Sequence, residues 1–403
     1  MRGDPSRGRR RFLADGLTVL AGASLVPSVR AEAGSARSAG ASPWPARPLG
    51  RTGLELPRLS MGCAQATDAG LIQAAHDAGL VHFDTAAHYA NGTNERLLGR
   101  ALSGRARDSF VIATKILPDG EDQRTGLFTE RTTVAPFLAK FERSLERLGL
   151  DFVDILYLHQ ASRAEAAAFE PLLKALEDIK HSGRARAIGV STHQREPEVI
   201  RAAARCGVYD VVLTSYNFRQ PHAAEVRDAI ALAASKGLGI VAMKALAGVY
   251  WDGERRRPID AAAALRWVLS DPNVDTCLAG FSTLDELQVC VQVIREPAMT
   301  ERDRAALRRD EEPGPAGLYC LQCAECRSQC PLGADVPTWM RGYMYANGYR
   351  RPARAKALLG AALGHPACRS CGSCPVRCRM GFDVRSRILD LSRLAEVPDV
   401  FVA

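Results

Sequence analysis

Short runs of β-branched and apolar residues alternate with longer stretches rich in Ala, Leu, Glu and Arg from residue 48 to about residue 310. The short runs have the composition of strands: LPRLSMG, VHFDTA, FVIATKI, FVDILYLH, ARAIGVST, DVVLTSYN, GIVAMKAL and VDTCLAG. Eight strand-and-helix units over roughly 260 residues match the ~250 residues of a (β/α)8 barrel. The alternative is a doubly wound open sheet, which requires a glycine-rich fingerprint after its first strand. The segment LSMGCAQATDAG of this chain matches that fingerprint poorly. The pattern therefore predicts an α/β fold with a (β/α)8 TIM barrel over residues 48–310.

The first 33 residues show the order of features found in an export signal. An arginine-rich head precedes an apolar stretch at residues 17–26 and the small-residue site AEA at 31–33, as in a cleavable signal peptide. The run RRRFL at residues 9–13 resembles the twin-arginine export motif, whereas the alternative is a disordered basic tail. The pattern predicts export to the periplasm, or anchoring in the membrane if the signal stays uncleaved. Residues 34–47 then read as a flexible linker.

The formal net charge of +8 does not indicate a nucleic-acid partner. Residues 1–33 hold six Lys/Arg and three Asp/Glu, so the rest of the chain carries +5. A nucleic-acid surface needs a concentrated basic stripe with interleaved aromatic residues. The nearest feature reads better as a solvated face beside a negatively charged cofactor, and it consists of Arg341, Arg350, Arg351 and Arg354. No segment other than the signal approaches the length of a transmembrane helix.

Four polar or ionisable residues follow consecutive predicted strands. Asp84 ends the second strand, Lys115 the third and His159 the fourth, while Tyr89 lies five residues beyond Asp84. In a (β/α)8 barrel the chemistry sits at the C-terminal ends of the strands, so these four side chains are expected to converge on one mouth. Taken singly, each has a structural explanation as a helix cap, a surface group or a rim aromatic. Their joint placement predicts an active site.

The chemistry of this group suits proton donation to a carbonyl. A lysine ammonium near a tyrosine favours the phenolate and lowers the pKa of the phenol, while a carboxylate keeps the lysine charged and aimed. Tyr89 can then protonate a carbonyl oxygen while His159 orients the substrate by a hydrogen bond. No side chain supplies hydride, so a nicotinamide cofactor is expected across the barrel mouth.

The segments HFDTAAHYANGTNERLLGRAL, VIATKI and LYLHQ resemble the aldo-keto reductase family, and LGRTGLELPRLSMG and ALRWVLSDPNVDTCLAGF extend the likeness over residues 48–295. The resemblance implies a barrel that binds NADPH or NADH without a Rossmann domain and reversibly reduces aldehydes, ketones or quinones. It implies that Tyr89 is the general acid, that Lys115 and Asp84 tune it and that His159 orients the carbonyl. It also implies that Ser191 bonds the nicotinamide carboxamide, that Tyr216 stacks on the ring and that Lys244 lies near the cofactor phosphates. A solvated rim lysine is the alternative for Lys244.

Several positions depart from the family pattern. Thr192 stands where many members have Asn, and Leu213 stands where a glutamine contacts the carboxamide. The lysine and arginine that commonly hold the 2′-phosphate of NADP fall at Gly280 and Glu286. A carboxylate repels a phosphate but accepts a hydrogen bond from a ribose hydroxyl, so the sequence leaves NADPH and NADH both open.

Eight of the twelve cysteines crowd into residues 320–378 in two runs with the spacing of cubane iron-sulfur ligation. The runs are offset by 48 residues and consist of Cys320, Cys323, Cys326 and Cys330, and of Cys368, Cys371, Cys374 and Cys378. A zinc ribbon would leave two cysteines of each run without a use, and a chain of this size does not need disulfides. The spacing predicts one or two 4Fe-4S clusters.

The segment from residue 315 to 403 resembles the C-terminal ferredoxin-type domain that some aldo-keto reductases carry. By the logic of two-cluster ferredoxins, the first three cysteines of each run share a cluster with the fourth of the other run. That logic gives Cys320, Cys323, Cys326 with Cys378, and Cys368, Cys371, Cys374 with Cys330. Residues 336–349 and 351–364 read as helices, so a small, mostly helical module is expected.

Two functional hypotheses follow. The first is an NAD(P)-dependent oxidoreductase that reduces a small carbonyl substrate, with an iron-sulfur module that is structural or docks an electron-transfer protein. The second is an exported iron-sulfur electron-transfer or redox-sensing protein whose barrel binds a small molecule without reducing it. Nicotinamide delivers two electrons as hydride whereas a cluster moves one at a time, so the clusters need not lie on the path of carbonyl reduction.

Overall fold

A computed structural model describes residues 42–122, 125–252, 255–308, 317–320 and 323–402. The predicted signal at residues 1–33 and the linker as far as residue 41 lie outside the described residues. The end of the predicted linker is not a free tether. The Trp44 indole donates a hydrogen bond to the Ala78 carbonyl at 2.7 Å, and strand β1 (Ala46–Pro48) pairs with β2 (Glu55–Pro57). The expectation of a structureless linker is therefore wrong for residues 42–47.

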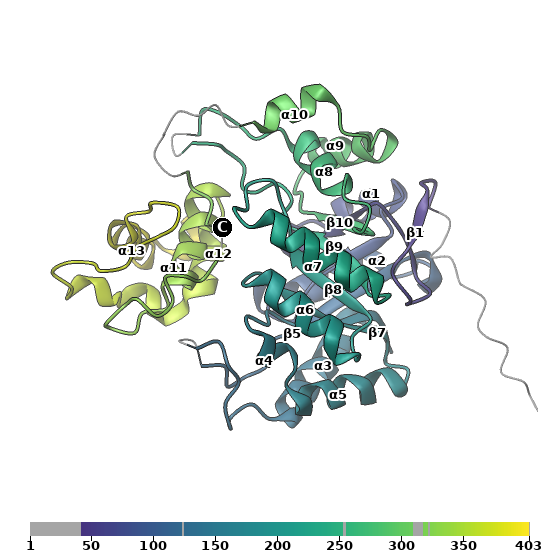
Figure 1. Cartoon of the computed structure of the whole chain (residues 1–403), viewed down its shortest axis with the longest axis horizontal. Coiled ribbons are helices and arrows are strands. Elements are labelled where there is room, and N and C mark those ends of the chain that lie inside the picture. Colours follow the sequence, from purple (N-terminus) through teal and green to yellow (C-terminus); the bar gives the residue numbers. More distant parts are fainter. Residues whose placement is uncertain (1–41, 123–124, 253–254, 309–316, 321–322, 403) are drawn as a thin grey trace, which may run out of the picture. The chain divides into compact units, whose positions relative to one another are not determined.

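The centre of the molecule is a closed barrel of eight parallel strands, which confirms the predicted (β/α)8 fold. Each strand pairs with the next in the chain, and the last strand pairs with the first to close the ring. Figure 1 labels the neighbouring strands β7, β8, β9 and β10 of this barrel. The barrel strands are β3 (Leu59–Gly62), β4 (His82–Asp84), β5 (Val111–Ile116), β6 (Val153–Leu158), β7 (Ala185–Thr192), β8 (Val211–Ser215), β9 (Gly239–Met243) and β10 (Thr276–Ala279).

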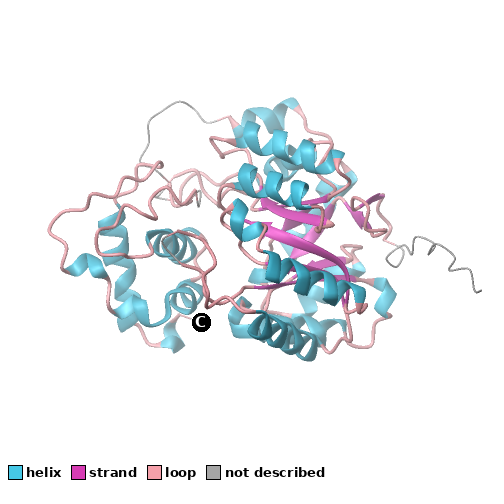
Figure 2. Ribbon diagram, turned by 60° about the horizontal axis from the view of Figure 1, so that its bottom comes forward, coloured by secondary structure: helices cyan, strands magenta, loops and turns pink. Residues whose placement is uncertain are grey.

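Helices alternate with these strands and surround them, as the cyan ribbons around the magenta strands show in Figure 2. The helix of residues 134–148 buries an apolar stripe, in which Phe137, Phe141 and Leu145 recur at helical spacing. The helices are α1 (Ala69–Asp77), α2 (Thr93–Leu102), α3 (Val134–Leu148), α4 (Ala164–Ala167), α5 (Glu170–His181), α6 (Glu196–Cys206), α7 (Ala223–Ser235), α8 (Ala261–Leu269), α9 (Leu284–Arg295) and α10 (Glu301–Leu307).

One end of the barrel is closed by the chain segment around β1 and β2. Leu49, Leu54 and Leu56 pack with the side chains that fill the barrel interior, such as Tyr157. The Arg51 backbone N–H donates to the carbonyl of Gly237, just before β9 begins, so this plug lies at the N-terminal ends of the strands. The C-terminal ends are thereby left as the face at which a site can form.

The C-terminal segment forms a helical module with its own core, as the sequence predicts. Helices α11 (Val336–Tyr343), α12 (Pro352–Leu359) and α13 (Val384–Ser392) pack together, and a π-helical turn at Met344–Gly348 follows α11 (Figure 1). Trp339, Met340 and Leu391 are buried in this second core beside Cys320, Cys326 and Cys368. Within the described residues, no helix combines the length and apolarity needed to cross a membrane.

Gly189 in β7 gives a test of the packing inside the barrel. A Cβ atom there would lie 2.6 Å from the Tyr157 ring and 2.6 Å from the Val211 carbonyl oxygen. We expect Gly189→Ala to lower the free energy of unfolding by about 1–3 kcal/mol, because the close-packed interior must shift to accept it. Urea unfolding followed by circular dichroism measures the change. Gly364→Ala is the control, since its nearest neighbour would be 4.0 Å away. Equal stability of the two variants would contradict the packing described.

Candidate active site

The four side chains predicted to converge do meet at the C-terminal ends of β4, β5 and β6. Asp84 ends β4, Lys115 lies one residue before the end of β5, and the backbone N–H of His159 donates to the Ile116 carbonyl at 3.0 Å. Asp84, Lys115 and His159 are only 2%, 1% and 1% exposed, whereas Tyr89 is partly buried in the turn after β4. Parallel pairing of neighbouring strands brings their carboxyl ends together, so the sequence positions translate directly into this cluster.

Lys115 is the hub of the cluster. Its ammonium donates to Asp84 Oδ1, to the Thr85 carbonyl at 2.5 Å and to the Tyr89 hydroxyl at 3.5 Å. It also lies 4.9 Å from the centroid of the Tyr89 ring. Burial opposes the charge on Lys115, but Asp84 and Tyr89 outweigh it and raise the pKa of the ammonium. Lys115 is therefore positively charged at neutral pH and stabilises negative charge on the Tyr89 oxygen.

The acidity of Tyr89 differs from the expectation drawn from the sequence. Burial raises the pKa of the phenol, and Lys115 only partly offsets that rise. The tyrosine is consequently protonated at neutral pH, which is the state that a general acid needs. Lys115 acts by stabilising the phenolate that forms after proton transfer, and it does not bring the resting phenol to ionisation.

His159 supplies a neutral hydrogen-bonding group beside Tyr89. Their ring centroids are 6.2 Å apart, and the Nδ1 atom of His159 is buried without a partner in the described part of the chain. Burial, together with nearby His88 and Lys115, lowers the pKa of His159 well below its usual range. The imidazole is therefore neutral, with one N–H to donate and one nitrogen to accept. An unpaired polar atom at this depth marks a place where a ligand can bind.

Two further histidines at the mouth were not predicted. His88 lies 4.6 Å and His193 lies 6.3 Å from His159, measured between ring centroids. Burial, followed by Lys244 and Arg341, lowers the pKa of His193 well below its usual range. Each is close in sequence to a predicted residue, since His88 precedes Tyr89 and His193 follows Ser191 by two positions. That adjacency was the available signal.

Ser191 is expected to bond the nicotinamide carboxamide, whereas Thr192 and Leu213 stand where the family has amide side chains. Ser191 ends up beside the catalytic cluster, because its buried hydroxyl accepts a hydrogen bond from the backbone N–H of Gln160, next to His159, at 3.0 Å. Thr192 turns its hydroxyl into its own loop and donates to the Gln194 carbonyl at 2.8 Å. Leu213 packs in the barrel interior. Ser191 therefore fits a carboxamide contact, whereas Thr192 and Leu213 do not replace the family's amide side chains.

Tyr216 is not placed to stack on a nicotinamide, and that expectation is wrong. Its hydroxyl donates to Asp271 at 3.1 Å and accepts from Arg227 at 3.0 Å, and its ring lies 4.9 Å from that of Trp267. These partners belong to α7, α8 and the residues after α8. Side chains alternate along β8, so the side chain of Tyr216 points outward to the helices while Leu213 points inward.

Lys244 follows β9 with a positive φ of 60°. Within the part of the chain that the structure describes, its ammonium has neither a hydrogen-bond acceptor nor an ion-pair partner. Partial burial, followed by the charge of Arg341, lowers the pKa of Lys244 to about 7. An unpaired ammonium at the mouth fits the phosphates of a dinucleotide, because an anion would restore its charge.

Gly280 and Glu286 lie on the loop after β10 and on the first turn of α9. Gly280 is exposed, and a Cβ there would find only the Gly62 carbonyl oxygen, at 3.8 Å. The Glu286 carboxylate accepts from the Ser282 backbone N–H at 2.7 Å and from the Ser282 hydroxyl at 3.2 Å. The carboxylate therefore braces this loop.

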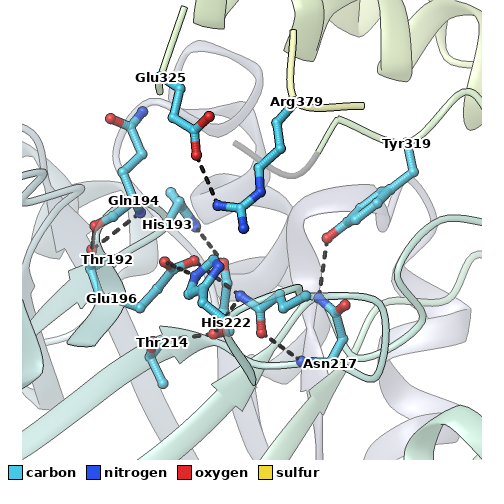
Figure 3. Close-up of polar contacts among 12 residues, drawn as sticks. Thr192, His193, Gln194, Glu196, Thr214, Asn217, His222, Tyr319, Glu325 and Arg379 are labelled. Carbon is cyan, nitrogen blue, oxygen red and sulfur yellow. Dashed lines mark hydrogen bonds and ion pairs between the residues drawn. The ribbon is translucent and has the colours of Figure 1, made fainter. Parts of the chain in front are cut away.

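The C-terminal module contacts the rim of the same mouth. The Asn217 amide, directly after β8, donates to the Tyr319 hydroxyl at 3.2 Å, and Arg327 donates to the Gln194 side chain at 3.1 Å. Figure 3 shows Tyr319 reaching Asn217 above the strand ends, and Arg379, paired with Glu325 at 2.9 Å, lying near the rim residues. These contacts attach the module to the barrel face at which the catalytic cluster lies.

The eight clustered cysteines gather into the two predicted sets of four. Cys330, Cys368, Cys371 and Cys374 line one cavity. Burial and the neighbouring Cys320, Cys323 and Cys378 raise the pKa of the Cys326 thiol, which places the other four together. No disulfide joins any of the cysteines in the described part of the chain. In the described ranges no three His, Cys, Asp or Glu side chains meet closely enough to hold a metal ion.

Residues 58–262, just over half of the chain, match the Aldo/keto reductase family, so this protein belongs to that family. Relatives of this protein are named as dehydrogenases and reductases, so this protein is an NAD(P)-dependent oxidoreductase. It is 31% identical to D-threo-aldose 1-dehydrogenase of a Pseudomonas species over 47% of this chain and 66% of that protein. It is 25% identical to L-glyceraldehyde 3-phosphate reductase of Escherichia coli K12 over 68% of this chain and 94% of that protein. The aldo-keto reductase AKR11C1 of Bacillus halodurans shares the fold, with a TM-score of 0.53 and 23% identity over 66% of this chain and 95% of that one.

The lowered pKa of Lys244 predicts that cofactor binding depends on pH. The free protein loses the ammonium charge as pH rises through about 7, while a bound phosphate favours the charged form. We expect the Kd for NADH to rise about tenfold between pH 6 and pH 8, and to change little in Lys244→Gln. NADH is the better probe because the 2′-phosphate of NADPH itself titrates in this range.

Fluorescence titration of NADH at each pH measures the effect. Lys236→Gln removes an exposed lysine outside the mouth and serves as the matched control. The same pH dependence in Lys244→Gln as in the parent would exclude Lys244 from the phosphate site.

Proposed function

We propose that this protein reduces the carbonyl group of a small aldehyde, ketone or quinone with NADPH or NADH, and that Tyr89 is the general acid. The observation that carries the proposal is the buried Lys115 ammonium, held by Asp84 within 3.5 Å of the Tyr89 hydroxyl beside the neutral His159. A cluster of this kind has no structural need for a protonated tyrosine, but proton donation to a carbonyl requires one.

The chain's own residues then divide the proton chemistry. The substrate oxygen accepts hydrogen bonds from the Tyr89 hydroxyl and from the N–H of His159, which orients the carbonyl. When bound, a reduced nicotinamide supplies hydride to the carbonyl carbon. Negative charge grows on the oxygen, Tyr89 transfers its proton there, and the alcohol forms. Lys115 stabilises the phenolate left on Tyr89, and Asp84 keeps the ammonium charged and aimed.

The residues that would hold the cofactor favour NADH over NADPH. Ser191 would bond the carboxamide and Lys244 the phosphates. Glu286 keeps a carboxylate on the loop after β10, where it repels a 2′-phosphate but can accept from a ribose hydroxyl. Few residues would therefore contact the dinucleotide, and the carboxylate of Glu286 would set the preference for NADH over NADPH.

The C-terminal module carries two 4Fe-4S clusters in this proposal. The cavity lined by Cys330, Cys368, Cys371 and Cys374 supports the second cluster, and the mutual influence of the remaining four thiols supports the first. Arg385, whose Nε donates to the Cys371 carbonyl at 3.1 Å, provides positive charge beside the cavity. Clusters exchange single electrons, so they serve structure or an electron-transfer protein and stay off the hydride path.

We also propose that the protein is exported, because residues 1–33 show the order of features found in a signal peptide. The twin-arginine route carries folded proteins, which suits a protein that must acquire iron before it leaves the cytoplasm. An exported iron-sulfur protein also needs an electron-transfer partner, if its clusters are redox-active. The second hypothesis, a barrel that binds without reducing, is tested by the same activity measurement as the first.

Tyr89→Phe tests the assignment of the general acid. The change removes the phenolic hydroxyl and with it the proton donor, so we expect carbonyl reduction to fall by about 10²- to 10⁴-fold while nicotinamide binding is retained. Consumption of NADH and NADPH, measured separately by anaerobic protein against aldehydes and quinones, gives the rates. Tyr343→Phe, in the C-terminal module, is the control. Undiminished turnover in Tyr89→Phe would refute the proposal, and no turnover in the parent would favour the binding hypothesis.

Cysteine variants test the two sets of ligands. We expect about eight irons per chain in the parent and a loss of about four in Cys371→Ser, with the other cluster retained. Cys378→Ser should instead impair the cluster of Cys320, Cys323 and Cys326. Iron and sulfide analysis with electron paramagnetic resonance separates these outcomes. Cys206→Ser, remote from both runs, should leave the iron content unchanged, and zinc in place of iron would reject the assignment.

A further inference from the structure

Two arginines of the C-terminal module reach over the catalytic cluster. Arg354 of α12 donates to the Ala64 carbonyl at 3.0 Å, and its guanidinium lies 5.6 Å from the Tyr89 ring centroid. Arg341 of α11 approaches the Gln160 side-chain oxygen at 3.5 Å, directly beside His159. Both side chains are partly buried. The two guanidinium groups therefore approach Tyr89 and His159, the residues that are expected to bind the substrate oxygen.

Among the described residues, neither charge is neutralised. The acceptors that Arg341 and Arg354 find there are all uncharged, and no carboxylate there forms an ion pair with either guanidinium. The Nε atom of Arg341 is buried without any partner in the same part of the chain. A charge that is partly removed from water without a counter-ion is unfavourable. Binding of an anion would therefore stabilise the guanidinium groups of Arg341 and Arg354.

The acidic groups nearby are already engaged. Asp84 is bound to Lys115, and Glu196 accepts from His222 at 3.0 Å and from Gln220 at 3.1 Å. Lys244 adds a further ammonium that has no partner among the described residues, and after burial the charge of Arg341 helps to lower the pKa values of His193 and Lys244. Dinucleotide phosphates account for Lys244. They do not account for two arginines placed beside Tyr89 and His159.

We infer that Arg341 and Arg354 form an anion-binding subsite and that the substrate is a carbonyl compound bearing a carboxylate or a phosphate. The inference rests on the proposed carbonyl reduction, whose substrate class it narrows. Both arginines lie outside residues 58–262, so the family likeness assigns them no role. Arginine forms two parallel hydrogen bonds with either anion, and the two guanidinium groups hold that end of the substrate while its carbonyl meets Tyr89.

Two alternatives make different predictions. In the first, the arginines only fasten the module to the barrel through Ala64 and Gln160. Their loss would then impair neutral and anionic substrates equally. In the second, they hold cofactor phosphates, and their loss would raise the KM for the nicotinamide instead of that for the substrate.

The experiment compares matched substrates in the full, iron-loaded protein. One pair is 4-carboxybenzaldehyde and its methyl ester, and the other is glyceraldehyde 3-phosphate and glyceraldehyde. We expect Arg341→Gln and Arg354→Gln to raise the KM for the preferred anion by about tenfold or more, with KM for its neutral partner and for the nicotinamide within about twofold. The pair that shows the effect distinguishes carboxylate from phosphate. Lysine at either position should recover part of the loss, and Arg350→Gln, an exposed neighbour, is the control.

Anion binding is measured separately, so that the subsite can be judged without turnover. Calorimetric titration with 4-(hydroxymethyl)benzoate and with glycerol 3-phosphate uses no hydride transfer. Binding that requires Arg341 and Arg354, in a protein that reduces nothing, would uphold the subsite and remove the proposed reaction. Failure of both anions to bind the parent, or equal losses for charged and neutral substrates, would overturn the inference.

Discussion

The buried ion pair between Lys115 and Asp84 is the constraint around which the site is arranged. A lysine ammonium that is 1% exposed is tolerated only because a carboxylate and the Thr85 carbonyl surround it. Removing either partner of such a pair leaves a buried charge uncompensated, which is strongly destabilising. The pair also joins the ends of two neighbouring barrel strands, so the barrel fixes its geometry. Burial keeps Tyr89 protonated and His159 neutral, and the charge of Lys115 acts on the pKa of both.

The C-terminal module extends that electrostatic arrangement from the barrel to a second segment of the chain. The barrel contributes a balanced pair, Lys115 with Asp84, and the unpaired ammonium of Lys244. The module contributes Arg341 and Arg354, which have no acidic partner among the described residues. Because the groups are partly shielded from water, their charges act more strongly than they would at an open surface. The mouth is therefore completed by residues outside the barrel, from the helical module that has a core of its own.

The parts of the structure that the sequence predicted are those governed by local patterns. Alternating strand and helix segments predicted the barrel, and positions at strand ends predicted Asp84, Lys115 and His159. The error at Tyr216 came from register, since alternation along β8 sends Leu213 inward and Tyr216 outward. The raised pKa of Tyr89 depends on burial, and the reach of Arg341 and Arg354 depends on how distant segments pack. Neither quantity is encoded in the spacing of residues along the chain.

The contact between Tyr319 and Asn217 links the geometry at Cys320 to the rim of the barrel. Tyr319 is bonded through a single peptide to Cys320, the first cysteine of the first run, and its hydroxyl meets the amide of Asn217 at 3.2 Å. A metal ligand is held to within about 0.2 Å by its bond, so ligation of Cys320 would set the position of the next residue almost as tightly. A displacement of Cys320 would also displace Tyr319. Incorrect loading of iron would therefore weaken the contact of Tyr319 with Asn217 at the rim of the barrel.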